Sequence, residues 1–378
     1  MPPMMAQQSE KPAVQAQSSP QPAPPQFFDP PQFTVSGVTD TTSLGGHGSD
    51  AVVRTRDTLA KETAALGKSS TDAANAPELL RAKQRTQALL AEHDAADLHH
   101  QLGDLDEKLG DPLAAVREYQ RAAEMDASEP YLFDWGAELL LHHAPEPASE
   151  VFAKGSRSFP KSGRMLLALG ASWLGRGSSD QAIPYISQAS DLNPGDPAPY
   201  LFLGKIQAVE KTSRVEIVAK LERFVTLHPE NAEANYYYAV GLWKQCKDAS
   251  NCAQLKQVES LLNTAIRLNP KFTAAFVQLG AVHAGQRDFR QAISDYQKAI
   301  RAGSNSADGG AELQEAHYRL AHAYRQVGDS DAAKAELEIY QRMVQASEQE
   351  VERERHEIQQ FVYTLRDPTA AQPRQTPQ

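Results

Sequence analysis

A pattern of small and large residues recurs about every 34 positions from Ala96 onward. In three successive blocks a glycine follows a large residue, and an alanine stands about a dozen positions later; these glycines are Gly103, Gly136 and Gly170. A repeat of this length is typical of stacked units in which each unit contacts only its neighbours. The sequence therefore favours an elongated solenoid.

The composition indicates that the repeated units are helical. The hydrophobic set makes up 41% of the 378 residues, but only 7% are aromatic, a balance that suits closely packed helices better than packed sheets. Gly and Ala at the recurring positions let two antiparallel helices approach closely. Pro after Asn, as in Asn193-Pro194 and Asn269-Pro270, ends a helix. We expect an all-α chain of helix pairs.

The recurring positions resemble those of the tetratricopeptide repeat family, whose units have a small residue at position 8, Ala at 20, an aromatic residue at 24, Ala at 27 and Pro at 32. The matching residues include Leu102-Gly103, Ala115, Tyr119 and Ala122; Trp135-Gly136, Ala148, Phe152 and Pro160; and Phe276, Leu279-Gly280, Ala292, Tyr296 and Ala299. Units starting near Tyr200 and Tyr236 fit more loosely. The resemblance implies a right-handed solenoid of about seven repeats that binds a protein or peptide.

The chain divides into five expected segments. These are a disordered Pro/Gln-rich tail with a Gly-rich linker at 1–50, N-terminal helices and a half-repeat cap at 51–95, the solenoid at 96–345, a C-terminal extension of the final helix at 346–366, and a tail at 367–378. Val344, Val351, Ile358 and Leu365 recur every seven residues, but the second stripe that a coiled coil needs is incomplete. We favour a helix that caps the last pair, and a weak homodimer stays an alternative.

Charge and hydropathy narrow the choice of partner. With 38 Lys+Arg against 48 Asp+Glu the formal charge is -10, which disfavours nucleic acid and anionic lipid. No run of apolar residues is long enough for an integral membrane segment. No signal peptide is recognisable at the N-terminus, so the expectation from the sequence as written is a cytoplasmic protein. The Pro/Gln/Ala-rich tract at 1–32 resembles the region after a cleaved signal in bacterial envelope proteins, so export from an upstream start stays open.

Motifs of catalysis and of metal binding are missing from the sequence. It contains no nucleotide phosphate loop, no His-Glu-x-x-His, no Gly-x-Ser-x-Gly and no Cys-x-x-Cys. The pairs His99-His100 and His142-His143 lack the spacing of metal ligands. We therefore expect no enzyme, no cofactor and no metal. Cys246 and Cys252 can form a disulfide only if a turn separates them, and free thiols are the equal alternative.

The concave face that the resemblance implies is the expected binding groove. Its positions are acidic in the first unit, apolar and aromatic in the middle, and basic in the last. The candidate partner-binding residues are Phe133, Leu167, Leu201, Phe202, Lys205, Tyr237, Tyr238, Tyr318, Arg319, His322 and Arg325. His100 and Asp104 stand where heat-shock co-chaperones of the family have Lys and Asn, so their carboxylate clamp is not expected. We expect a scaffold that binds an apolar segment; a self-assembling structural or envelope-assembly protein is the alternative.

Overall fold

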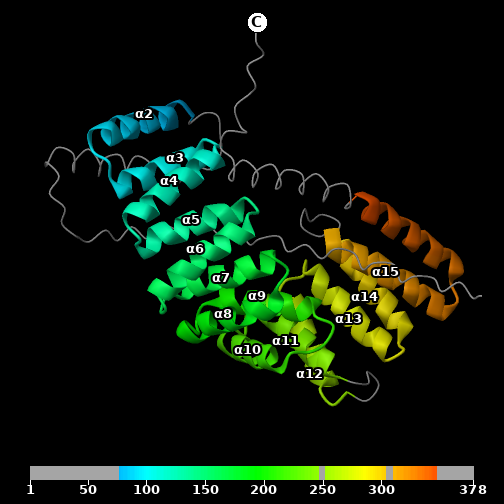
Figure 1. Ribbon diagram of the computed structural model, residues 1–378. Coiled ribbons are helices and arrows are strands. Elements are labelled where there is room, and N and C mark those ends of the chain that lie inside the picture. Colours follow the sequence, from blue (N-terminus) through cyan, green and yellow to red (C-terminus); the bar gives the residue numbers. More distant parts are fainter. Residues whose placement is uncertain (1–75, 247–251, 304–309, 347–378) are drawn as a thin grey trace, which may run out of the picture.

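The computed structural model describes residues 76–246, 252–303 and 310–346, and over these ranges it contains helices and turns but no strand. Figure 1 shows the helices stacked side by side along an arc that starts at α2. The all-α solenoid class predicted from the repeat is confirmed. The helices are α2 (Ala76–Glu92), α3 (Ala96–Lys108), α4 (Pro112–Met125), α5 (Glu129–Leu141), α6 (Pro145–Ser158), α7 (Gly163–Gly175), α8 (Ser179–Leu192), α9 (Pro197–Val209), α10 (Val215–Leu227), α11 (Ala232–Gln245), α12 (Leu255–Leu268), α13 (Thr273–Gly285), α14 (Phe289–Gly303), α15 (Gly310–Val327) and a last helix described over 330–346.

Several expectations lie outside the described residues. They are the tail and linker at 1–50, the part of the N-terminal helices at 51–75, nearly all of the extension of the final helix at 346–366, and the tail at 367–378. Most of the stripe at intervals of seven also lies there, so the capping helix and the weak homodimer stay predictions.

Local sequence fixes where many helices begin. Proline stands in the first turn of α4, α5, α6 and α9, where its missing N–H costs no hydrogen bond. Side chains cap other starts: Asp111 accepts from the backbone N–H of Ala114, and Asn231 accepts from that of Ala234. Most of the helices in the described ranges are 13 or 14 residues long.

Consecutive helices pack as antiparallel pairs, from α3 with α4 to α13 with α14, and α15 precedes the helix at 330–346. The first helix of a pair also contacts the first helix of the next pair, as α9 contacts α11 and α13 contacts α15. We call the side formed by α3, α5, α7, α9, α11, α13 and α15 the inner face. In Figure 1 it lies inside the arc, with α8, α10 and α12 outside.

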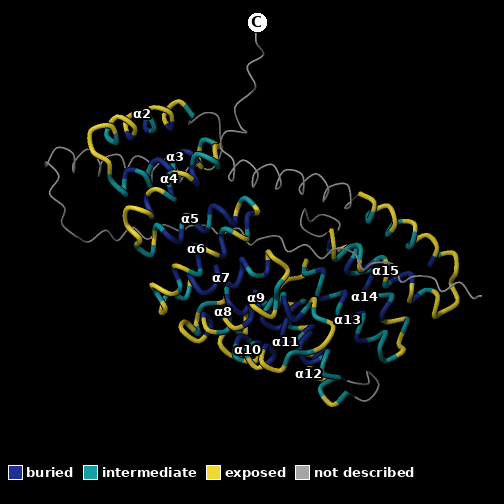
Figure 2. The backbone as a smooth tube through the Cα atoms, viewed as in Figure 1, coloured by how far each residue is buried: buried dark blue, intermediate teal, exposed yellow. Residues whose placement is uncertain are grey.

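The hydrophobic core runs along the stack between the two layers of helices (Figure 2). One cluster of buried side chains extends from Val116 to Val282, and a second lies beneath α13, α14 and α15 around Tyr296 and Leu320. The helices α13, α14 and α15 therefore pack around a separate hydrophobic cluster. The candidate site lies on these three helices.

Candidate functional site

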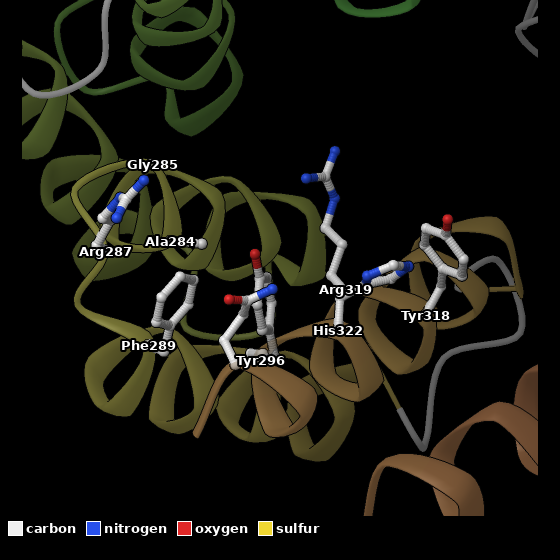
Figure 3. A pocket seen from close by; sticks show the side chains of 10 residues that line it. Ala284, Gly285, Arg287, Phe289, Tyr296, Tyr318, Arg319 and His322 are labelled. Atoms are coloured by element: carbon white, nitrogen blue, oxygen red, sulfur yellow. The ribbon is translucent and has the colours of Figure 1, made fainter. Parts of the chain in front are cut away.

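An open pocket of about 540 Å³ lies on the inner face where α13, α14 and α15 meet (Figure 3). We call it the C-terminal pocket. Two arginines, a histidine and three aromatic rings contribute most of its chemistry. Its lining residues are Ala284, Gly285, Arg287, Phe289, Tyr296, Tyr318, Arg319, His322, Ala323 and Gln326.

Residues that lie on one face of α15 form one wall of this pocket. Tyr318, His322 and Gln326 are four residues apart, so their side chains follow one another along one face of the helix. The rings of Tyr318 and His322 meet edge to face, with their centroids 4.7 Å apart. Tyr318 is 43% exposed, which leaves its ring available to a partner.

The opposite wall comes from the end of α13 and the start of α14. α13 ends at Gly285, and the chain turns through Arg287 before α14 starts at Phe289. Figure 3 shows Arg287 on one side of the pocket and Arg319 with His322 on the other, with Phe289 and Tyr296 between them. Tyr296 packs beside Gly280, where any side chain on that residue would meet the ring.

Arg319 is held in place by two neighbours. Its Nε donates to Glu315 Oε1 over 2.7 Å, and it also hydrogen-bonds to the hydroxyl of Tyr296. Burial alone would lower the pKa of Arg319, but Glu315 and Tyr296 outweigh it and hold the pKa above its ordinary value. Burial raises the pKa of Tyr296 to about 12, so its hydroxyl is neutral. The pocket therefore has a fixed cation above a neutral phenol.

Two other cations, Arg287 and Arg325, lie at or near the pocket. Among the described residues, neither Arg287 nor Arg325 forms an ion pair, and both are exposed. Arg325 lies three residues after His322 on α15, just beyond the lining residues. Within the described ranges, these two positive charges at the C-terminal end of the inner face are therefore not neutralised by an ion pair.

The other end of the inner face is an acidic network that joins α3, α4 and α5. His100 Nε2 lies 2.7 Å from Asp134 Oδ2, and the Tyr119 hydroxyl donates to Asp104 over 2.8 Å and to Glu107 over 3.2 Å. Burial raises the pKa of both Asp104 and Glu107. These carboxylates are satisfied within the fold, so the network ties the first two helix pairs together.

Close contacts between glycines and aromatic rings connect the two helices of a pair. A Cβ on Gly103 would lie 2.7 Å from the ring of Tyr119, and one on Gly136 would lie 2.6 Å from that of Phe152. Gly280 stands in the same relation to Tyr296. The small residue at position 8 thus receives the aromatic residue at position 24, which is the arrangement that the sequence pattern predicts.

A sequence profile described as tetratricopeptide repeat matches residues 96–129 and 314–338. These ranges cover α3 with α4, and α15 with the start of the last helix. These two segments of the chain are tetratricopeptide repeats. No curated protein matches it in sequence.

Several solved structures are similar to this chain. The Cut9–Hcn1 hetero-tetramer of the APC/C matches with a TM-score of 0.45 and 17% identity, over 78% of this chain and 53% of that one. Yeast Tom70 gives 0.43 and 16%, over 76% and 60%. YrrB, described as having an unusual peptide-binding site, gives 0.36 and 17%, over 58% and 93%. This chain spans about half the length of its Cut9–Hcn1 match, and no function is transferred at these values.

The predicted groove residues fall into three groups in the tetratricopeptide repeat structure. Tyr318, Arg319 and His322 line the C-terminal pocket, and Arg325 is exposed beside it. Leu201 and Lys205 on α9 are half-buried. Five predicted residues in the middle of the groove are at most 8% exposed: Phe133, Leu167, Phe202, Tyr237 and Tyr238. A binding role for any of these residues stays a prediction.

Contacts with neighbouring helix pairs explain this burial. Tyr237 of α11 packs on Gly204 of α9, where a Cβ would lie 2.3 Å from its ring. The Arg164 guanidinium of α7 lies 4.4 Å from the ring centroid of Phe133 on α5 and covers it. The Tyr238 hydroxyl hydrogen-bonds to Glu222 of α10 and Gln257 of α12, so that side chain points toward second helices. The middle aromatics hold the stack together.

Sequence reasoning missed Arg287, Phe289 and Tyr296 as members of the pocket. Tyr296 was assigned to the repeat pattern, and the other two stand in or after the turn, outside the first-helix positions expected to line the groove. A usable signal is present in the sequence, since Arg287 stands where three other helix pairs have glycine, whereas a fourth has His143.

Three further features concern the cysteines, the histidines and the hydropathy of the helices. Cys246 and Cys252 are joined by a disulfide, with their Cα atoms 5.2 Å apart, between the end of α11 and the start of α12. His99 contacts Glu118 and Asp94, and no group of three or more His, Cys, Asp or Glu residues is arranged to hold a metal ion over the described ranges. None of the described helices is long and apolar enough to cross a membrane.

Proposed function

We propose that this chain is a protein-interaction scaffold that holds a segment of a partner protein against the inner face at α13–α15. The supporting observation is the C-terminal pocket itself, which is open and is lined by α13, α14, α15 and the turn at Arg287. It carries the exposed ring of Tyr318 and the guanidinium of Arg287, which forms no ion pair within the described residues. Tetratricopeptide repeat proteins bind proteins or peptides, and none of the residues in the pocket forms a nucleophile and base pair of the kind that catalysis needs.

Because the aromatic residues in the middle of the inner face are buried, we propose that the partner is anchored elsewhere on this face. Exposed aromatic residues in a concave surface are typical anchors, because they bury a large area at a small entropic cost. On the inner face this description fits Tyr318, which is 43% exposed, and not Tyr237 or Tyr238. The partner segment is therefore anchored near the end of the stack.

The test is selection of binding peptides against the full chain from a displayed library of random linear peptides. Tyr318→Ser should weaken capture of the selected peptides by about tenfold, as expected for an interface anchor. Leu227→Ser is the matched control, because Leu227 is 47% exposed at the end of α10 and far from the pocket. Equal loss in both variants, or failure to select any peptide, contradicts the proposal.

A further inference from the structure

We propose that the C-terminal pocket recognises an acidic side chain of the bound peptide, followed or preceded by an apolar residue that lies on the aromatic rings. This inference rests on the proposed scaffold function and deepens it by naming the chemistry of the ligand. It is carried by an arginine that the fold places at the pocket in a backbone conformation better suited to glycine.

Arg287 occupies a turn position that recurs along the stack. In the turns after α3, α7 and α15 the corresponding residues are Gly110, Gly177 and Gly328, with φ of 76°, 72° and 85°. Arg287 has φ of 63° in the turn after α13. In each of these turns the residue donates its backbone N–H to the carbonyl three positions earlier, so the turns share one geometry.

This conformation is unfavourable for arginine. An L-residue with a side chain pays about 1–2 kcal/mol in the left-handed region, whereas glycine does not. Residues kept in such conformations cluster at binding and active sites. Arg287 forms no ion pair within the described residues that would offset this cost. A ligand at the pocket is therefore the natural partner of its guanidinium.

The surrounding charges favour an anion there. Arg319 faces Arg287 across the pocket and keeps a permanent charge, and exposed Arg325 lies on the same helix (Figure 3). Glu315 neutralises Arg319 in part, and Asp288 uses one carboxylate oxygen to cap α14 at Gln291. The cations that remain can bind a carboxylate in the paired geometry typical of guanidinium groups.

The aromatic rings of the pocket determine which kind of peptide residue can lie next to the acidic one. Phe289 is half-buried, and Tyr318 is exposed, so each offers ring area to an apolar neighbour. A pocket of about 540 Å³ holds a few side chains rather than a whole helix. A nucleic acid is a poorer fit, because the chain carries a net charge of -10.

The experiment compares the sequences selected from the peptide library by the full chain and by three variants. The wild type should select peptides enriched in Asp or Glu next to an apolar residue. Arg287→Gly should bind those peptides about tenfold more weakly, while unfolding at a higher urea concentration because the strained turn is relieved. Arg287 is thus tested by two readouts that move in opposite directions.

Two control variants separate charge at the pocket from other effects. His143→Gly removes a second non-glycine residue of positive φ, 55°, in the turn after α5, so it should gain stability and leave binding unchanged. Arg290→Ser removes an exposed arginine that is three residues from Arg287 and does not line the pocket, and it should also leave binding unchanged.

The outcomes distinguish this inference from the scaffold proposal. Selected peptides that lack an excess of Asp or Glu, or that bind Arg287→Gly as tightly as wild type, overturn the acidic ligand while leaving the scaffold intact. A single-stranded oligonucleotide that displaces the peptides at a lower concentration than an acidic peptide also overturns it. If no peptide is selected at all, the scaffold proposal itself fails.

Discussion

Arg287 and Gly328 occupy equivalent turns: each has a positive φ, 63° and 85°, and each donates its backbone N–H to the carbonyl three residues earlier. The structure therefore repeats one left-handed turn between the two helices of several pairs. Glycine is the residue that this turn prefers, because the left-handed region is open to it without a steric cost.

We expect Gly177→Ala to destabilise the chain by about 1 kcal/mol. Gly177 has φ of 72°, and no atom lies within 4 Å of a Cβ placed on it, so the cost comes from the backbone alone. Gly163→Ala is the control, because Gly163 starts α7 without a positive φ and its nearest contact would be 3.9 Å away. Urea unfolding followed by circular dichroism measures both, and equal midpoints for the two variants would contradict the expectation.

Gly204→Ala should destabilise the chain more strongly, by about 1–3 kcal/mol, because overpacking forces helices apart. A Cβ on Gly204 would lie 2.3 Å from the ring of Tyr237, which belongs to the next helix pair. Adding Tyr237→Leu should recover part of the loss, since the smaller side chain leaves room for the methyl group. Thermal unfolding of the single and the double variant tests this. An unchanged melting temperature for Gly204→Ala alone would show that the contact is not tight.

The ion pair between His100 and Asp134 predicts a pH-dependent stability. Burial alone would lower the pKa of His100, but the hydrogen bond to Asp134 and the charges of Asp104 and Asp97 raise it. The pKa is thus higher in the folded state, so the stabilisation is complete below the unfolded value of about 6.5 and is lost as the pH rises through the folded value.

We therefore expect His100→Gln to lose most stability relative to wild type near pH 5.5 and progressively less toward pH 8. Asp134→Asn should remove a large share of the same pH-dependent part, because it removes the carboxylate that hydrogen-bonds to the imidazolium and leaves only the charges of Asp104 and Asp97. Chemical unfolding at several pH values gives both differences. A difference that stays constant over this range would show that His100 does not titrate with a raised pKa.

The disulfide between Cys246 and Cys252 predicts a loss of stability on reduction. The chain-entropy cost of opening a loop with a sequence separation of 6 is about 2 kcal/mol. We expect a lower unfolding midpoint for Cys246→Ser with Cys252→Ser, and no further effect of a reductant on that double variant. Mass spectrometry of the unreduced chain should show no free thiol, and two alkylated cysteines would contradict the bond.

The fold was predictable because its pattern is local. Each contact of this pattern lies within a single helix pair, as for Gly103 with Tyr119, Gly136 with Phe152 and Gly280 with Tyr296. Spacing along the sequence therefore indicates these contacts. The resemblance to the tetratricopeptide repeat family covered the same residues, and the structure has the expected helix pairs around them.

The binding face was harder to predict because its exposure depends on contacts between pairs. Tyr237 is buried by Gly204 of the preceding pair, and Phe133 is covered by Arg164 of the following one. Neither contact can be derived from the position of a residue within its own repeat. Tyr318 and His322 escaped this effect because they lie near the end of the described stack.

Hydrogen exchange of the full chain, with and without a selected acidic peptide, is the most direct measurement of where the partner binds. We predict slower exchange of backbone amides in α13 and α15 and in the turn at Arg287, with no change in α5 and α7. We also predict that the protection disappears in Arg287→Gly. Protection centred on α5, α7 or α10 instead, or protection that persists in Arg287→Gly, would contradict an acidic ligand in the C-terminal pocket.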